Sequence, residues 1–280
     1  MTIDTHVHFW KYNKLRDGWI TENMKVLQQD YLPEQLMLNL KRNGVDGCVA
    51  VQASQEEVET RFLAELSKTH DFIKGVVGWI DLRADKVEQT LEHFCEHSII
   101  KGYRHIVQAE PDDFLLREDF QRGVRALKQY DYAYDILIYP FQLQSTLAFV
   151  SKFPDQKLVI DHCAKPDIKN GEMKEWKKLI SEIAEHRNVY CKVSGLFTEA
   201  VWKGWSVSEF YPYLDVVFEA FGIDRLMFGS DWPVILLSGI YVQWKSLLEK
   251  YMERFAQQDK EKVFGLNAVA FYNLDAALSG

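Results

Sequence analysis

Cysteine, positive charge and long apolar runs are all scarce in this 280-residue chain. The four cysteines are scattered and form no CxxC pair, which excludes a disulfide framework and indicates reduced thiols in a reducing compartment. Lysine and arginine number 33 against 41 aspartates and glutamates, and the net charge of −8 argues against a nucleic-acid-binding protein. The longest apolar stretch, residues 234–242, is interrupted by Ser238 and Gly239, and is too short to cross a membrane. We therefore expect a cytoplasmic protein with neither nucleic-acid nor membrane partners.

The chain also lacks a Pro-, Gly- or Ser-rich linker, which predicts a single domain over residues 1–280. No glycine-rich phosphate loop follows the first β-rich run, which argues against an open, doubly wound sheet, the alternative α/β architecture. Eight β-rich runs alternate with helix-like segments at a spacing of roughly 20–45 residues. Eight such units predict a parallel sheet closed into a (β/α)8 TIM barrel. The runs are Thr2–His8, Asp46–Gln52, Lys74–Asp81, Ile99–His105, Tyr132–Tyr139, Lys157–His162, Val189–Ser194 and Arg225–Asp231.

The segments between these runs carry charge and helical periodicity. The longest excursion is residues 195–208 (GLFTEAVWKGWSVS), which has two tryptophans and weak periodicity. We expect it to form a lid-like loop after the seventh strand. The clearest helical segments are Glu56–His70, Lys86–His97, Arg117–Tyr130 and Lys174–Arg187.

Two histidines stand two residues apart near the start of the chain, in Ile3-Asp4-Thr5-His6-Val7-His8. Successive side chains of a strand alternate between faces, so His6 and His8 project the same way, with Asp4 beneath them. Burying three polar residues on one face is costly unless they bind something. Two converging imidazoles can hold a divalent metal or an oxygen-rich substrate. Since the pair starts at residue 6, we expect no cleaved signal peptide.

Catalytic residues of (β/α)8 barrels lie at the C-terminal ends of the strands and in the loops that follow them. Polar side chains gather at nearly every such end in this chain, which packing alone does not explain. They are Gln52, Asp81, Arg83, Arg104, His105, Tyr139, Asp161, His162, Lys165, Lys192, Ser194, Ser230 and Asp231.

Five blocks, IDTHVHFW, KGYRH, DHCAKP, KVSGL and FGSDWPV, occur in this order between Ile3 and Val234. Together they resemble the amidohydrolase superfamily, in its lactonase-like "amidohydrolase 2" branch, which includes sugar-acid lactonases and pyrone-dicarboxylate lactonase. The resemblance implies that His6 and His8 face the site from the first strand, with Asp231 opposite on the eighth. It further implies a catalytic role for Asp231, which takes a proton from the attacking water and returns it to the leaving group.

His162 is the third candidate imidazole, either as a metal ligand or as a catalytic hydrogen-bond donor to the substrate carbonyl. Because adjacent strand residues point oppositely, only one of Asp161 and His162 faces the interior unless the strand has already ended. The chain departs from the binuclear members of the superfamily, because Tyr139 and Lys192 end the fifth and seventh runs where those members have histidines. A two-metal centre is therefore not expected.

The expected cofactor is one divalent metal ion, with zinc favoured, because three protein ligands and an open position suit a catalytic zinc. Its candidate ligands are His6, His8 and Asp231, with His162 as a fourth. A weakly held ion and metal-free catalysis, which the resemblance permits for some lactonases, both stay open.

The developing oxyanion of a lactone needs fixed positive charge or hydrogen-bond donors. Arg104 is the candidate for this catalytic role, and Arg83 and Lys165 are candidates for substrate binding. Aromatic faces stack well on the apolar side of a sugar ring, and Trp79, Tyr139 and Trp232 are the candidates here. Only two arginines lie near strand ends, which favours a neutral sugar lactone over a dicarboxylate.

The expected function is hydrolysis of a small sugar-acid lactone, of the L-fucono- or L-rhamnono-lactone type, to the aldonic acid. The alternatives are a metal-dependent decarboxylase of an aromatic or semialdehyde acid, a pyrone-dicarboxylate-type lactonase, and a non-catalytic sugar-binding barrel. Whether the protein forms a homo-oligomer stays open. The sequence does not specify the sugar, its ring size or its stereochemistry.

Overall fold

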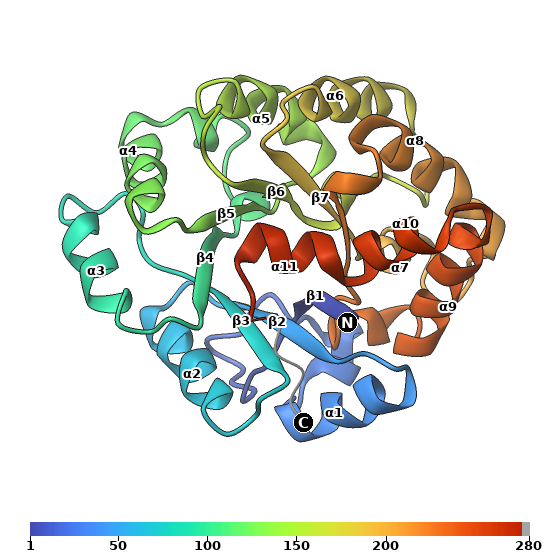
Figure 1. Ribbon diagram of the computed structural model, residues 1–280, viewed down its shortest axis with the longest axis horizontal. Coiled ribbons are helices and arrows are strands. Elements are labelled where there is room, and N and C mark those ends of the chain that lie inside the picture. The colour runs from blue at the N-terminus through green and yellow to red at the C-terminus, as the bar shows by residue number, and fades with distance from the viewer. Residues whose placement is uncertain (276–280) are drawn as a thin grey trace.

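The computed structural model describes residues 1–275, whose eight parallel strands form one sheet in the order β1 to β8. A backbone bridge between Val7 and Trp232 joins the end of β1 to the segment after β8 and nearly closes the ring. The predicted (β/α)8 barrel is thereby confirmed (Figure 1). The strands are β1 (Ile3–Val7), β2 (Gly47–Val51), β3 (Ile73–Gly78), β4 (Ile100–His105), β5 (Ala133–Ile136), β6 (Leu158–Ile160), β7 (Val189–Val193) and β8 (Leu226–Phe228).

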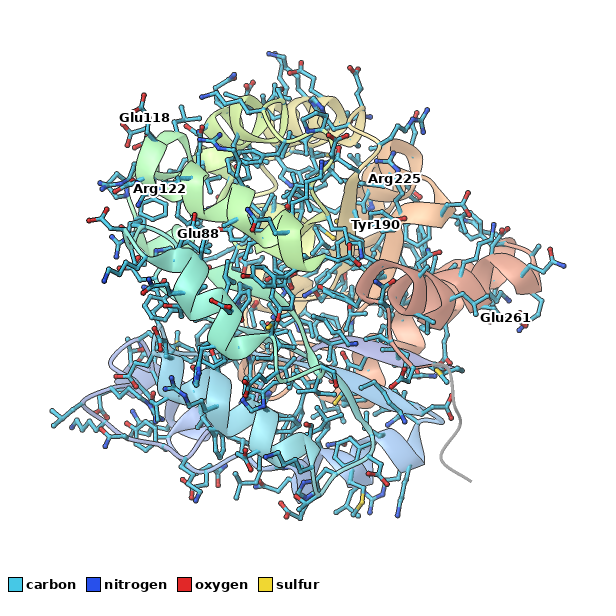
Figure 2. The ribbon with its side chains drawn as sticks, turned by 60° about the vertical axis from the view of Figure 1, so that its left-hand side comes forward. Glu88, Glu118, Arg122, Tyr190, Arg225 and Glu261 are labelled. Atoms are coloured by element: carbon cyan, nitrogen blue, oxygen red, sulfur yellow. The ribbon has the colours of Figure 1, made fainter. Side chains whose placement is uncertain are left out.

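Helices surround the strand ring, and each of the four helical segments predicted from periodicity contains one (Figure 1). Their charged side chains reach solvent, as Glu118 and Glu261 do at the periphery of Figure 2. The helices are α1 (Pro33–Arg42), α2 (Glu57–Ser67), α3 (Val87–Phe94), α4 (Glu118–Leu127), α5 (Leu143–Val150), α6 (Lys174–Ala184), α7 (Leu196–Glu199), α8 (Tyr211–Phe221), α9 (Tyr241–Tyr251), α10 (Gln257–Glu261) and α11 (Asn267–Tyr272).

The interior of the barrel has an apolar end, which α11 covers. Val49, Val77 and Met227 from three strands form one buried cluster with Phe271 of α11. Figure 1 shows α11 lying across the middle of the strand ring, and the ring of Tyr190, labelled in Figure 2, lies 4.6 Å from that of Phe271. Since this cluster fills the N-terminal end of the barrel, the polar residues that follow the strands gather at the opposite end.

The segment 195–208 differs from the free loop expected for a lid. It begins with α7, and Phe197 is buried and stacked on Trp205 with ring centres 4.1 Å apart. The Trp205 indole N–H donates to the Ser238 carbonyl at 2.8 Å. This packing ties the segment to the loop after β8.

The expected absence of disulfides is confirmed, because all four cysteines are free thiols. Three of them are buried, and only Cys95 is exposed. No helix within residues 1–275 is both long and apolar enough to traverse a lipid bilayer.

Candidate active site

Four side chains from three distant segments converge at the C-terminal end of the barrel. His6 lies on β1, His8 follows it directly, His162 follows β6 and Asp231 follows β8. The Asp231 Oδ1 atom lies 3.3 Å from Nε2 of His8 and 3.9 Å from Nε2 of both His6 and His162. The structure therefore brings the N-terminal histidine pair and the distant carboxylate together, as the sequence predicts.

The outer nitrogens of the three imidazoles have partners of their own. Nδ1 of His8 lies 2.8 Å from the Val51 carbonyl oxygen, and Nδ1 of His6 lies 3.3 Å from Oδ1 of Asp161. The carbonyl oxygen at His8 is an acceptor, which favours hydrogen on Nδ1 of that ring, whereas Nδ1 of His6 also lies 3.4 Å from the Lys192 ammonium nitrogen. Nδ1 of His162 contacts the Ser194 hydroxyl at 2.9 Å. All three rings are thus fixed in orientation.

A left-handed turn places His162. β6 ends at Ile160, and the four residues 162–165 have φ angles of 54°, 53°, 58° and 49°. None is glycine, and each costs about 1–2 kcal/mol relative to a right-handed conformation. Because the strand has ended, Asp161 and His162 both face the interior, which resolves the alternative left open by the sequence. Gly195 (φ 67°) lies against the His162 ring, and a Cβ there would be 2.5 Å from its Nδ1.

Asp4 connects the two halves of the site from below. Its Oδ1 accepts hydrogen bonds from the backbone N–H groups of His6 (3.1 Å) and Ser230 (2.8 Å). It therefore holds β1 and the segment that carries Asp231 in register.

A buried network of charges lies under His6. The Lys192 ammonium contacts Oδ2 of Asp135 and lies 3.1 Å from Oδ1 of Asp161, and all three side chains are fully buried. Arg104 donates to the other Asp161 oxygen at 3.0 Å. Sequence reasoning missed the part played by Asp135 and Asp161. The available signal was an aspartate inside the otherwise apolar fifth strand, because a buried carboxylate needs a cationic partner.

Arg104 connects this network with the cavity above it. Its guanidinium contacts the Gln52 carbonyl oxygen and also donates to Gln52 Oε1 at 2.9 Å. Its Nη1 lies 3.2 Å from Nε2 of His6. The guanidinium is thus a fixed, buried positive charge beside the imidazoles.

Burial and neighbouring charges shift the pKa values of the site in opposite directions. Burial lowers the pKa of His162 to about 4 and that of His6 well below its usual value, so both are neutral at pH 7. Burial alone would raise the pKa of Asp231, but its electrostatic interactions with His162, His8 and His6 outweigh burial and hold that pKa below its usual value. Asp231 is therefore ionised and can accept a proton or bind a cation.

A cavity of about 250 Å³ opens above these groups. Its walls include five residues selected from the sequence: His8, Arg104, His162, Lys165 and Asp231. His6 lies beneath it, fully buried.

Sequence reasoning missed three further residues of the cavity wall, Trp19, Gln55 and Gln108. The Oε1 atom of Gln108 is buried and has no hydrogen-bond partner among the described residues. These residues lie in segments that connect a strand to the next helix, for which the alternation of strand side chains carries no signal.

Three predicted substrate contacts do not reach this cavity. Arg83 forms an ion pair with Asp81, two residues earlier, at 2.9 Å. Trp79 donates its indole N–H to His105 at 3.3 Å. Trp232 is buried with its ring 5.3 Å from that of Tyr31. Each of these side chains contacts a neighbour instead of lining the cavity, and its assignment to substrate binding stays a prediction.

Another predicted substrate contact, Tyr139, lies next to the cavity. The ammonium of Lys165 lies 5.4 Å from the centre of the Tyr139 ring and 3.4 Å from Oε1 of Glu199. Tyr139 and Glu199 line a second hollow, which Lys165 shares with the first.

The geometry also suits a metal ion. His6, His8 and Asp231 each offer one ligand atom, and these atoms lie within 4.8 Å of one another. A second group, His6 with Asp161 and His162, meets the same distance criterion. Its Asp161 oxygens are already engaged by Lys192 and Arg104, so the first group is the better candidate.

Comparisons with known proteins agree with this geometry. The chain is 36% identical over 279 residues to L-fucono-1,5-lactonase of Burkholderia ambifaria, covering 98% of this chain and 96% of that protein. It is 37% identical over 286 residues to L-fucono-1,5-lactonase of Burkholderia multivorans, with the same coverage. A crystal structure of an amidohydrolase from Burkholderia multivorans with bound zinc superposes with a TM-score of 0.95 at 37% identity, covering 98% of this chain and 99% of that one. The amidohydrolase family profile matches residues 3–274. This protein belongs to the amidohydrolase family.

Proposed function

We propose that this protein is a lactonase that opens the lactone of a single sugar acid, of the L-fucono-1,5-lactone type. The observation that carries the proposal is the ionised Asp231 facing three oriented imidazoles at the floor of a small cavity. The similarity to two proteins named L-fucono-1,5-lactonase supports the substrate class. The L-rhamnono-type lactone expected from the sequence is the next substrate to test.

Asp231 acts first as the general base. It takes a proton from a water molecule as the water oxygen attacks the lactone carbonyl carbon. The carbonyl oxygen becomes an oxyanion, which the buried guanidinium of Arg104 and a hydrogen bond from His162 stabilise. The bond from the former carbonyl carbon to the ring oxygen then breaks, and Asp231 returns its proton to that oxygen. The product is the open-chain hydroxy acid.

We infer that the site holds one divalent metal ion, with zinc as the best fit. Ligand atoms around a tetrahedral zinc are about 3.3 Å apart. Asp231 Oδ1 lies 3.3 Å from Nε2 of His8 and 3.9 Å from Nε2 of His6. The acceptors at Nδ1 of both histidines are the partners that metal-bound imidazoles usually have. A bound ion would supply Lewis acidity to the carbonyl and the attacking water.

Lys165 is the proposed substrate-binding cation. Burial would lower the pKa of Lys165, but the charges of Glu199, Tyr139 and Asp231 outweigh it and raise that pKa, so the side chain stays positive. With Arg104 as the one arginine on the cavity wall among the described residues, the site favours a neutral sugar lactone.

A panel of 1,4- and 1,5-aldonolactones tests the proposal, with proton release followed as each ester opens. The purified enzyme is assayed as isolated, after chelation, and after reloading with zinc, and its metal content is measured each time. We expect turnover of L-fucono-1,5-lactone and loss of turnover in Asp231→Asn. A folded protein that opens no lactone contradicts the function, and unchanged rates after complete metal removal contradict only the metal assignment. Release of carbon dioxide from an aromatic acid would favour the decarboxylase alternative.

His8→Ala and His70→Ala form a matched pair for the metal. His8 is one of the proposed ligands, whereas His70 follows α2 on the outside of the barrel and contacts Glu34. We expect zinc to be lost only from the His8 variant.

A further inference from the structure

A second and larger cavity adjoins the one that contains Asp231. Its volume is about 990 Å³, four times the 250 Å³ of the inner cavity. The loops after β5, β6 and β7 form its walls, and these strands lie side by side in the barrel (Figure 1). Lys165 lines both cavities. The two cavities are therefore neighbours that meet at the Lys165 side chain.

Aromatic rings form one wall of the outer cavity. The rings of Tyr139 and Phe141 are stacked with centres 6.0 Å apart and planes at 24°. Phe141 is 61% exposed, although apolar rings of this size are usually buried. An exposed ring beside a second, parallel ring offers a flat apolar face, and the C–H face of a sugar ring stacks well on such a surface.

The charged residues of the outer cavity restrict which group can lie there. Four carboxylates face two ammonium groups along its walls, and this excess of negative charge disfavours an anionic ligand. Carboxylate oxygens accept hydrogen bonds from hydroxyl groups. The lining thus suits a neutral, hydroxyl-rich group. These charged residues are Asp167, Glu172, Glu175, Glu199, Lys165 and Lys174.

We propose that the outer cavity binds a second, neutral sugar ring attached to the lactone, so that the enzyme also opens disaccharide aldonolactones. This inference rests on the proposed lactonase function. The lactone ring occupies the inner cavity beside Asp231, and the glycosyl group stacks on the exposed ring of Phe141. Hydrolysis is the same reaction as for the simple lactone, since only the ester bond of the ring breaks and the glycosidic bond is untouched.

Phe141→Ala tests the aromatic wall, with Leu38→Ala as its matched control. Leu38 lies on α1, is 54% exposed and lines neither cavity. The substrates are neutral disaccharide aldonolactones that differ in the hydroxyl carrying the second sugar, each compared with its unsubstituted lactone. We expect Phe141→Ala to lower kcat/KM about tenfold for the preferred disaccharide lactone and less than about twofold for the simple lactone. Leu38→Ala should change neither.

A binding measurement separates failure of this inference from failure of the proposed function. The alditol of the same disaccharide has no lactone to open, and its binding to the three proteins is measured by calorimetry. Saturable binding that Phe141→Ala weakens supports the cavity assignment. If the enzyme opens simple lactones but neither opens the disaccharide lactones nor binds the alditol, the inference is overturned and the lactonase function stands. Equal losses on both substrates in Phe141→Ala also overturn it.

Discussion

Gly195→Ala is the sharpest test of how the site is held together. The new Cβ would lie 2.5 Å from Nδ1 and 2.6 Å from Cγ of His162, where an ordinary contact begins at 3.4 Å. The imidazole must therefore move by about 0.9 Å, because the Cβ itself is fixed to the backbone. A displacement of about 1 Å in a group that acts on the substrate can cost about 100-fold in rate. We expect a loss of this size in kcat for the preferred lactone.

The same substitution also strains the backbone, since Gly195 has a φ of 67°. Placing a side chain in this left-handed region costs about 1–2 kcal/mol of stability. Gly44→Ala separates the two effects, because Gly44 has a φ of 62° and an added Cβ would have no neighbour within 4 Å. The control should lose similar stability and keep its activity.

Steady-state kinetics and denaturant unfolding on both variants provide the measurement. A Gly195→Ala enzyme with wild-type kcat would refute the reasoning, as would equal losses of activity in the two variants. A crystal structure of Gly195→Ala with the His162 ring unmoved would refute it independently of activity.

Three further outcomes follow from the buried charges and the proposed metal ligands. Lys192→Met leaves the carboxylates of Asp135 and Asp161 without their buried ammonium, and we expect the free energy of unfolding to fall by about 3–5 kcal/mol; a loss below about 1 kcal/mol would contradict this. Burial raises the pKa of Asp4 to about 6, so the folded protein holds this proton more tightly than the unfolded chain does. The contribution of Asp4 to stability should therefore fall by about 3 kcal/mol as pH rises from about 4 to above 6, measured as the difference in the free energy of unfolding between the wild type and Asp4→Asn at each pH. The zinc content of His8→Ala should fall to background, and retention of wild-type zinc would remove His8 from the ligand set.

The sequence predicts much of the barrel because β-rich runs and helical periodicity are local properties of the chain. Seven of the eight predicted runs contain a whole strand, β3 begins one residue before its run at Ile73, and each observed strand ends at or before the predicted end. The predicted run that contains β6 shows why the predicted and observed strand ends differ. Asp161 and His162 continue the run in the sequence, but a left-handed turn begins at His162 and ends the pairing at Ile160. A positive φ in a non-glycine residue depends on tertiary contacts, so the sequence carries little sign of it.

The convergence of His6, His8 and Asp231 was also predictable. Side chains alternate along a strand, which places His6 and His8 on one face, and all strand ends of a parallel barrel meet at one rim. That Asp231 lies opposite this pair was implied by the resemblance to the amidohydrolase superfamily. No comparable rule exists for Arg83, which pairs with Asp81 outside the cavity. Whether the Arg83 guanidinium pairs with a neighbouring carboxylate or reaches a substrate depends on side-chain distances, which only the folded structure determines.

The sequence by itself thus determined the order of the strands, the end of the barrel that carries the chemistry, and the histidine pair facing an aspartate. Only the tertiary structure decided that Lys192 joins Asp135 to Asp161 under that pair, and that Lys165 lies between two cavities. The physical reason is that alternation and periodicity act over a few residues, whereas a buried ion pair or a cavity wall depends on how distant segments pack.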